Sequence, residues 1–251
     1  MARTLGVLGG MGPAATVRFM DAMVKGAQAT RDQEHVPTIT RMATDVPSRL
    51  DFLEGIQGAE DPFPLMSEHL IKLAAEAKLL AIPCNTVHAA WYPQLADLAE
   101  RSGARLLHIV DGVSEALKDE GIKTGRIGLL ASTPTVEMEL YPDRFAQLGL
   151  NYEVVVPGAE EQRHVHAAVT GFKAGNYGEA SQTILAAVRG LRELGCQTVV
   201  LGCTEFYLAL QHSNLNPKSV TDSNAAFGAY SARQAQRVLR PTRAKLKSQV
   251  T

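Results

Sequence analysis

Two segments of the chain repeat one pattern: an apolar run ends in a small residue or proline, and cysteine and polar residues follow. The first segment is Leu80–Thr86, which contains Cys84, and the second is Val199–Glu205, which contains Cys203. A buried strand that stops at a thiol and continues as a loop gives this pattern. The pattern therefore predicts a site at which two cysteines face one small substrate.

The repetition extends beyond the cysteines. The apolar segment around Gly6 resembles the one around Gly128, 122 residues later, and Cys203 lies 119 residues after Cys84. Two matches at nearly the same offset indicate that the chain consists of duplicated halves. An alternative stays open, because strands of parallel sheets are apolar on both faces and resemble one another without duplication.

Short apolar segments alternate with segments of helical spacing, which predicts an α/β fold with mostly parallel sheets. We expect two similar domains, each a mostly parallel sheet flanked by helices, with the active site between them. Expected strands cover 5–8, 38–42, 79–82, 106–110, 127–130, 152–156 and 198–201. Expected helices cover 14–27, 64–76, 89–100, 113–118, 135–148 with a bend or break at Pro142, 178–193, and a last helix capped at 222–224 that runs to 239.

The expected domain bounds follow from these segments. Residues 1–100 together with a returning segment, 212–240, form the first domain, and 101–211 form the second. Residues 241–251 form a basic tail that holds Arg243, Lys245 and Lys247 and has no apolar period. A tail of this kind is more typical of a frayed, solvated end than of a functional basic arm.

Composition excludes several classes of partner. With 45% hydrophobic and 20% charged residues, the 251-residue chain is typical of a globular protein, and its net charge of −1 gives no sign of nucleic acid or an anionic membrane as partner. No apolar run is long enough to span a bilayer, and Gly9-Gly10 interrupts the first one too early for a signal peptide. We therefore expect a cytoplasmic protein whose three cysteines are free thiols.

A glycine loop at residues 9–13 ends the first expected strand and opens a helix. Glycines let backbone N–H groups approach an anion, and a helix N-terminus favours negative charge, so the loop predicts a carboxylate or phosphate cradle. The loop also fits a degenerate dinucleotide fingerprint, which requires an acidic residue at the end of the next strand. Asp32 and Glu34 precede that strand instead of following it, so we favour the cradle; a tight turn without ligand is the third possibility.

The cysteines and histidines differ in their expected roles. Cys84 and Cys203 follow strands at equivalent positions, so we expect both to act in catalysis, whereas Cys196 precedes its strand and is expected to be structural. We expect no metal site, because the cysteines lack Cys-x-x-Cys spacing and the pair His164 and His166 has no third ligand at a plausible spacing.

Two cations stand at positions that suit an acidic substrate. Arg49 lies in a loop after the second strand, and Lys173 lies between expected helices. Either side chain could hold a carboxylate, arginine through a two-pronged contact. Taken alone, each is more often a solvated surface charge.

The motifs resemble those of the cofactor-independent aspartate/glutamate racemases. The matching segments are 8–16, 82–88 and 201–205, with weaker similarity at 128–135, 157–162 and 172–175. The resemblance implies two similar α/β domains with the active site between them, a homodimer, and an amino acid as substrate, with aspartate first and glutamate second. No lysine stands in a recognisable pyridoxal phosphate motif, so no cofactor is expected.

The resemblance also implies roles for single residues. Cys84 and Cys203 are the two acid/base groups, because inverting a stereocentre requires a base on one face of Cα and an acid on the other. His88, four residues after Cys84, is expected either to tune a thiol or to serve packing, and Glu205 is the other candidate for tuning a thiol. The expected substrate-binding residues are Met11, Gly12, Arg49, Asn85, Thr86, Thr133, Lys173 and Thr204.

Two positions depart from the pattern of members with acidic substrates. Ser48 stands where aspartate is frequent, and Val169 stands where tyrosine is common. Both concern the side-chain preference of the site and leave the racemase chemistry untouched. Two alternatives remain open at this point: another superfamily activity, such as that of maleate isomerases or arylmalonate decarboxylases, or a dithiol redox or binding protein without turnover.

Overall fold

The computed structural model describes residues 4–210 and 219–237 of the chain. They form two four-stranded sheets with the same order, β2-β1-β3-β4 and β6-β5-β7-β8, and every pair of neighbouring strands is parallel. The strands are β1 (Leu5–Gly9), β2 (Thr38–Met42), β3 (Leu79–Ala81), β4 (Arg105–Leu106), β5 (Gly125–Leu130), β6 (Tyr152–Val155), β7 (Val199–Leu201) and β8 (Val220–Asp222). The expected fold, two similar parallel α/β sheets flanked by helices, is confirmed.

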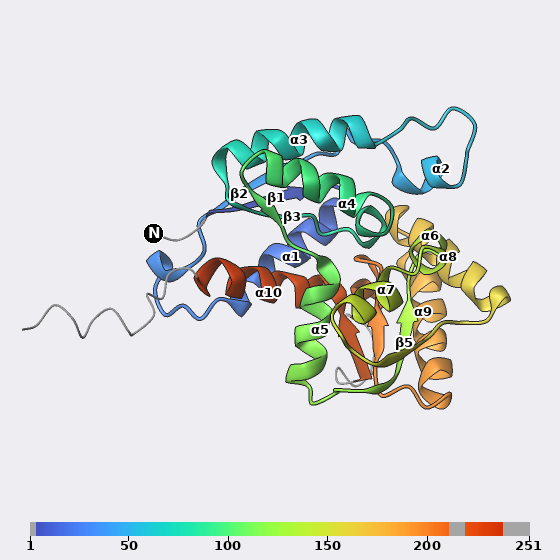
Figure 1. The fold of residues 1–251 in the computed structure, drawn as a ribbon. Coiled ribbons are helices and arrows are strands. Elements are labelled where there is room, and N and C mark those ends of the chain that lie inside the picture. Colours follow the sequence, from blue (N-terminus) through green and yellow to red (C-terminus); the bar gives the residue numbers. More distant parts are fainter. Residues whose placement is uncertain (1–3, 211–218, 238–251) are drawn as a thin grey trace, which may run out of the picture.

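Helices cover both sheets (Figure 1). They are α1 (Pro13–Gly26), α2 (Arg49–Leu53), α3 (Phe63–Glu76), α4 (Asn85–Arg101), α5 (Ile109–Asp119), α6 (Thr133–Glu137), α7 (Leu140–Gln147), α8 (Ala159–Lys173), α9 (Tyr177–Glu193) and α10 (Ser223–Arg237), with the 3-10 turns η1 (Asp32–Glu34) and η2 (Phe206–Leu210). Among the described residues, none of these helices is both long and apolar enough to cross a membrane.

A shared core joins the two sheets. Leu5 of the first sheet and Ile127 of the second belong to one buried cluster, together with Phe19 of α1, Val113 of α5 and Phe227 of α10. Two further clusters lie on the outer faces, one between the first sheet and α3 and α4, the other between the second sheet and α8 and α9. The two sheets are therefore held together by apolar burial as well as by the chain that connects them.

Helix α10 returns from the second sheet and packs against α1 and α5 (Figure 1). Small residues make this contact close: a Cβ at Gly26 would lie 2.5 Å from the Ala229 Cα, and one at Gly228 would lie 2.5 Å from the Phe19 carbonyl oxygen. The expected cap of α10 is confirmed, because the Asp222 carboxylate accepts hydrogen bonds from the backbone N–H groups of Asn224 at 2.9 Å and Ala225 at 3.2 Å.

Four expected elements need correction. The apolar run 106–110 is not one strand, because β4 ends at Leu106 and α5 begins at Ile109 after the His108 imidazole caps it. Helix α4 begins at Asn85, four residues before the expected start. The helix expected at 135–148 is broken at Glu139, which has a φ of 50°, rather than at Pro142, which fits the first turn of α7. The strand expected at 152–156 ends at Val155.

Two helices and one strand were not expected at all, namely α2, which carries Arg49 where a loop was expected, α8 and β8. The strand β8 pairs with β7 and so belongs to the second sheet, and β4 pairs with β3 and so belongs to the first. The division of the chain into domains stays a proposal. The strand pairings establish only the sheet to which each strand belongs. The basic tail at 241–251, the expected helix end at 239 and part of the expected returning segment lie outside the described residues.

Candidate active site

The two cysteine loops leave equivalent strands. Cys84 follows β3 and Cys203 follows β7, the strands that lie third in the order of each sheet. Because both loops begin at the carboxyl ends of their strands, the two thiols reach the same crevice between the sheets. Both line one cavity of about 20 Å³, and all three cysteines of the chain are free.

Most of the expected site residues line this inner cavity. Met11, Arg49, Cys84, Asn85, Thr86, Lys173, Cys203, Thr204 and Glu205 do so, together with Leu50, Ser132, Val169 and Gly202. A cavity of about 20 Å³ has room for about one water molecule. An amino acid therefore enters only if side chains or whole elements around the cavity move.

An outer cavity of about 500 Å³ adjoins the inner one. Arg49, Lys173 and Glu205 line both cavities, so these three side chains lie between them. Gly12 lines only the outer cavity. The outer walls are largely apolar, with Phe172 and Leu208 among them.

Cys203 lies against a carboxylate. Its thiol donates a hydrogen bond to Glu205 Oε2 at 3.3 Å, and the Thr204 hydroxyl donates to the same oxygen at 3.0 Å. Burial, and next the negative charge of Glu205, raise the pKa of the Cys203 thiol well above its usual value. These surroundings favour the protonated thiol at this position.

Cys84 lies at the N-terminus of a 17-residue helix. It is the N-cap residue of α4, and its side chain makes no capping hydrogen bond. A helix N-terminus favours negative charge, and this sets Cys84 apart from Cys203, which lies against a carboxylate. The expected tuning by His88 is not direct: its Nδ1 lies 2.9 Å from the carbonyl oxygen of Cys84, and it does not line the cavity.

Two buried imidazoles stand behind the first cysteine loop. His88 stacks on Tyr92 at 5.5 Å between ring centroids and meets the edge of His108 at 5.2 Å. Burial lowers the pKa of His88 to about 4 and lowers that of His108 further, because a charged ring at either position would lie away from water. Both rings are therefore neutral at pH 7.

Arg49 begins α2 and turns its guanidinium toward its own loop. Its Nη1 donates to the carbonyl oxygens of Pro47 at 2.9 Å and of Val46 at 3.3 Å. Its Nε is buried and has no hydrogen-bond partner among the residues that the structure describes. Arg49 is therefore held in place with donor capacity left for a carboxylate in the cavity.

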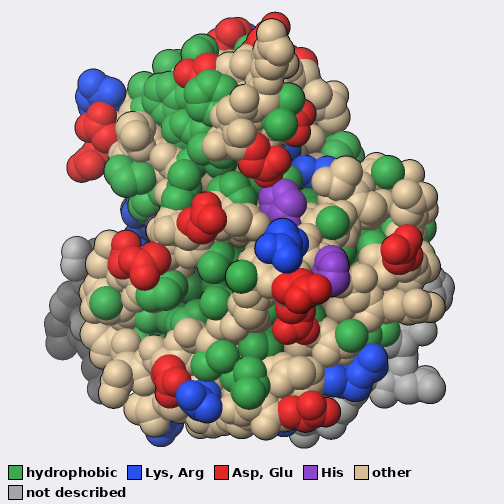
Figure 2. Space-filling model, turned by 90° about the vertical axis from the view of Figure 1, so that its right-hand side faces the viewer, with side chains coloured by type: hydrophobic (Ala, Val, Ile, Leu, Met, Phe, Trp, Pro, Cys, Tyr) green, Lys and Arg blue, Asp and Glu red, His purple; other side chains and the backbone are tan. Residues whose placement is uncertain are grey.

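A histidine outside the cavity links the two halves, and the helices α2 and α8 that it connects lie at the right of Figure 1. His166 of α8 accepts a hydrogen bond at Nδ1 from the Thr133 backbone N–H at 3.0 Å, and its Nε2 lies 3.0 Å from the Glu54 carboxylate, which follows α2. Figure 2 views this face and shows histidine, basic and acidic side chains gathered along its middle. This contact ties α2, which carries Arg49, to the second half.

The glycine loop packs against protein atoms. The Gly10 N–H donates to the Thr16 hydroxyl at 2.9 Å, and a Cβ at Gly10, whose φ is +89°, would lie 2.5 Å from the backbone nitrogen of Ala43. A Cβ at Gly12 would lie 2.8 Å from Glu205 Oε1. The carboxylate nearest to this helix N-terminus is thus the protein's own Glu205.

Ser132 is a cavity residue that sequence reasoning passed over in favour of Thr133. Its hydroxyl shares hydrogen bonds with Thr86 at 3.3 Å and with Thr135 at 2.9 Å, whereas Thr133 does not line the cavity and its backbone N–H is taken by His166. Ser132 follows the end of β5 directly after Ala131, so its place at the carboxyl edge could have marked it.

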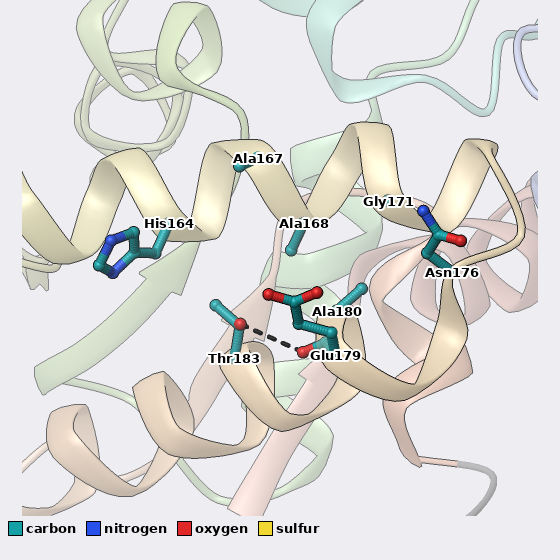
Figure 3. Close-up of a pocket in the computed structure, with 8 residues that line it drawn as sticks. All are labelled: His164, Ala167, Ala168, Gly171, Asn176, Glu179, Ala180 and Thr183. Atoms are coloured by element: carbon teal, nitrogen blue, oxygen red, sulfur yellow. Dashed lines mark hydrogen bonds between the residues drawn. The ribbon is translucent and has the colours of Figure 1, made fainter.

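Another groove, of about 380 Å³, runs between α8 and α9. Figure 3 shows His164 at one end of it, Asn176 at the other and Glu179 between them. Neither Cys84 nor Cys203 lines this groove, and no arginine or lysine does. The groove therefore lacks the thiols and cations that the motifs predict for the active site. No group of three or more histidine, cysteine, aspartate or glutamate side chains within 4–210 and 219–237 is arranged to hold a metal ion.

Comparison with known proteins defines the class. The family model for Asp/Glu/Hydantoin racemase matches residues 8–227, and the chain belongs to this family. The resemblance drawn from the motifs and the expected class of enzyme, an isomerase of the racemase type, are therefore confirmed.

Individual relatives and solved structures resemble this chain to different degrees. A glutamate racemase from Ectopseudomonas mendocina (strain ymp) is 37% identical over 183 residues, which cover 70% of this chain and 62% of that protein. The solved aspartate racemase of Picrophilus torridus superposes with a TM-score of 0.72 at 24% identity, over 93% of this chain and 94% of that one. The glutamate racemase of Francisella tularensis subsp. tularensis SCHU S4, solved in complex with D-glutamate, gives 0.60 at 14% identity, over 96% and 85%. The two structures share the fold of this chain.

Proposed function

We propose that the protein is a pyridoxal-phosphate-independent amino-acid racemase that uses Cys84 and Cys203 as its two acid/base groups. The observation that carries the proposal is that both thiols, which leave equivalent strands of two sheets with the same order, line one cavity. Aspartate is the first candidate substrate and glutamate the second, since both names occur among the relatives.

One thiolate and one thiol perform the reaction. The Cys84 thiolate takes the Cα proton from one face, so that the Cα–H bond breaks and an S–H bond forms. The Cys203 thiol gives its proton to the opposite face, which forms the new Cα–H bond and leaves Cys203 as thiolate. The opposite enantiomer is then converted by the same steps in reverse. Alternatively, proton exchange with solvent restores the thiolate at Cys84 and the thiol at Cys203.

The asymmetry of the two loops supports this starting state. The helix N-terminus at Cys84 favours a thiolate. At Cys203, burial and Glu205 raise the thiol pKa, and the thiol donates its hydrogen bond to that carboxylate. The proton that the substrate receives therefore starts on Cys203.

The remaining cavity residues bind the substrate in this proposal. Arg49 takes a carboxylate through its free Nε side, and Lys173 adds a second positive charge. The hydroxyl groups of Thr86 and Thr204 and backbone N–H groups near Met11 stabilise the charge that develops when Cα loses its proton. Movement of the surrounding side chains to admit the substrate, followed by closure, excludes water and strengthens these contacts.

The proposal also covers the binding partners of the protein and its location in the cell. The protein works without pyridoxal phosphate, nucleotide or metal, takes a small amino acid as its substrate, acts as a homodimer and resides in the cytoplasm. Nucleic acid and membrane take no part. Dialysis against EDTA and treatment with hydroxylamine should leave the rate unchanged; a large loss that pyridoxal phosphate restores would contradict this.

The direct test is exchange of the α-proton in D2O. Both enantiomers of aspartate and of glutamate are incubated with the protein, and the α-proton signal is followed by NMR together with chiral analysis. We expect loss of the signal with formation of the opposite enantiomer for at least one of the two amino acids. Exchange of neither amino acid would overturn the assignment of an acidic substrate.

A further inference from the structure

A buried line of hydrogen bonds connects the two cysteine loops. The Tyr141 hydroxyl donates to Asn85 Oδ1 at 2.8 Å, Asn85 Nδ2 donates to the Ser223 hydroxyl at 3.1 Å, and that hydroxyl donates to the Leu201 carbonyl oxygen at 2.7 Å. The exposed fractions of the Tyr141 and Ser223 side chains are 0%, and that of Asn85 is 3%. We call these groups the Asn85 network.

The Asn85 network includes one residue at each cysteine loop, Asn85 and Leu201. Asn85 directly follows Cys84 and begins α4, and Leu201 ends β7 two residues before Cys203. Ser223, which begins α10, lies between them in the network, whereas Tyr141 of α7 bonds to the other end of the Asn85 amide. The network thus joins segments that are 56, 138 and 22 residues apart in sequence.

The direction of every bond is fixed by chemistry. The Leu201 carbonyl oxygen can only accept, so the Ser223 hydroxyl donates its one proton there and must accept from Asn85. The amide group of Asn85 then presents its NH₂ to Ser223 and its oxygen to Tyr141. Burial raises the pKa of the Tyr141 hydroxyl, so it stays protonated and remains a donor. A flipped Asn85 amide would leave two buried groups without partners, which is costly.

We propose that Tyr141 and Ser223 are positioning residues that fix the spacing between the Cys84 and Cys203 loops. The inference rests on the proposed two-cysteine reaction, in which both thiols must reach one Cα from opposite faces. Proton transfer depends steeply on distance, and a displacement of about 1 Å can cost about 10²-fold in rate. Asn85 holds the first loop through both ends of its amide, in addition to its contact with the cavity.

The chain offers a matched control for each position. Ser231 lies on the same helix as Ser223, is equally buried, and its hydroxyl has no hydrogen-bond partner among the described residues. The Tyr152 hydroxyl donates to the Ile122 carbonyl oxygen at 2.8 Å, as short as the Tyr141 bond, but joins neither cysteine loop. Ser231→Ala and Tyr152→Phe therefore remove the same atoms as Ser223→Ala and Tyr141→Phe without touching the Asn85 network.

The test compares inversion with exchange. In D2O, a displaced thiol still removes and returns a proton on its own face, but inversion needs both thiols at once. We expect Tyr141→Phe and Ser223→Ala to slow inversion by up to about 10²-fold, to slow exchange without inversion much less, and to change KM little. A purely structural defect lowers both rates by the same factor, because it removes active protein.

The two controls should keep the wild-type ratio of exchange to inversion. The double variant Tyr141→Phe/Ser223→Ala should show about the ratio of the stronger single variant, because both act through one network. An unchanged ratio in both single variants, or equal shifts in the controls, would overturn the inference while leaving the racemase proposal intact. A wild-type protein that neither exchanges nor inverts any amino acid would instead overturn the proposed function, and the inference with it.

Discussion

The two cysteine loops begin at equivalent strands and end in different surroundings. After β3, Cys84 caps a 17-residue helix, and the nearest imidazole, His88, bonds to the Cys84 carbonyl oxygen and not to the sulfur. After β7, Cys203 lies in a turn before the 3-10 segment η2, and its thiol donates a hydrogen bond to Glu205. Repetition of the fold thus supplies two thiols at equivalent positions, and the local surroundings of the two thiols differ.

This difference shows how a repeated fold can serve an asymmetric step. A racemase needs one base and one acid at the start of each turnover, and two identical environments would leave both thiols in the same state. In the proposed reaction, a helix N-terminus on one side and a buried carboxylate on the other account for the two different starting states. The predictions below probe each loop in turn.

The largest effect is expected from removal of either thiol. Cys84→Ala and Cys203→Ala should each lower racemisation by about 10²–10⁴-fold, the range typical of general acid–base groups. Cys196→Ala is the control, since Cys196 is buried at the opposite end of β7 and should keep nearly full activity. Chiral analysis of both directions, with circular dichroism to verify folding, measures the effect; near wild-type racemisation without either thiol would return that thiol to a structural role.

The imidazoles behind the first loop should make the protein sensitive to acid. Burial lowers the pKa of His88 to about 4 in the folded state, whereas the unfolded chain takes up this proton near pH 6.5. Between these values the unfolded state binds more protons, so the free energy of unfolding falls as the pH falls from 6.5 to 4, by about 3 kcal/mol for this group.

Urea unfolding at several pH values measures this slope. His88→Gln should flatten it, and His164→Gln, on an exposed position of α8, should leave it unchanged. Equal slopes in the wild type and His88→Gln would show that His88 is not held neutral by burial.

Arg49 serves both loops through the shared cavity, and its replacement should have an intermediate effect. Arg49→Lys should reduce kcat/KM for the accepted amino acid, because a point charge cannot reproduce a two-pronged contact. The reduction should correspond to a loss of about 1–3 kcal/mol in transition-state stabilisation. The exposed Arg163, changed to lysine, provides the control. Unchanged kinetics in Arg49→Lys would remove Arg49 from the substrate site.

The smallest change in structure, Glu205→Gln, is the sharpest probe of the second loop. It removes the negative charge that raises the pKa of Cys203, so the pKa should fall and Cys203 should react faster with iodoacetamide at neutral pH. Peptide mapping by mass spectrometry, with Cys84 as internal reference and Glu161→Gln on the surface as control, measures the rate. An unaltered rate at Cys203 would refute the role of Glu205 in holding the proton.

Much of the fold could be predicted because buried parallel strands are continuously apolar. The strand at Leu5–Gly9 and the runs before both cysteines stand out for this reason. The apolar run after Leu106 led to a wrong prediction, because an apolar segment of this length suits a strand or a buried helix equally. Only the His108 cap distinguishes the two structures. The three-residue β8 depends on pairing with β7, which no local pattern reveals.

Sequence reasoning reached most of the site but not what holds it together. Nine of the expected residues line the inner cavity, because motif positions at strand ends meet at one edge of a parallel sheet. The helix that carries Lys173 was missed, although Val165, Val169 and Phe172 repeat at helical spacing. Contacts such as that between Asn85 and Ser223, 138 residues apart, become visible only in three dimensions.

The central claim is that the two thiols serve opposite faces of Cα, and single-thiol variants in D2O test it most directly. Each enantiomer of the accepted amino acid is incubated with Cys84→Ala and with Cys203→Ala, and α-proton exchange is followed by NMR. The account predicts that each variant exchanges one enantiomer only, and that the two variants exchange opposite ones. Exchange of the same enantiomer by both variants would contradict it.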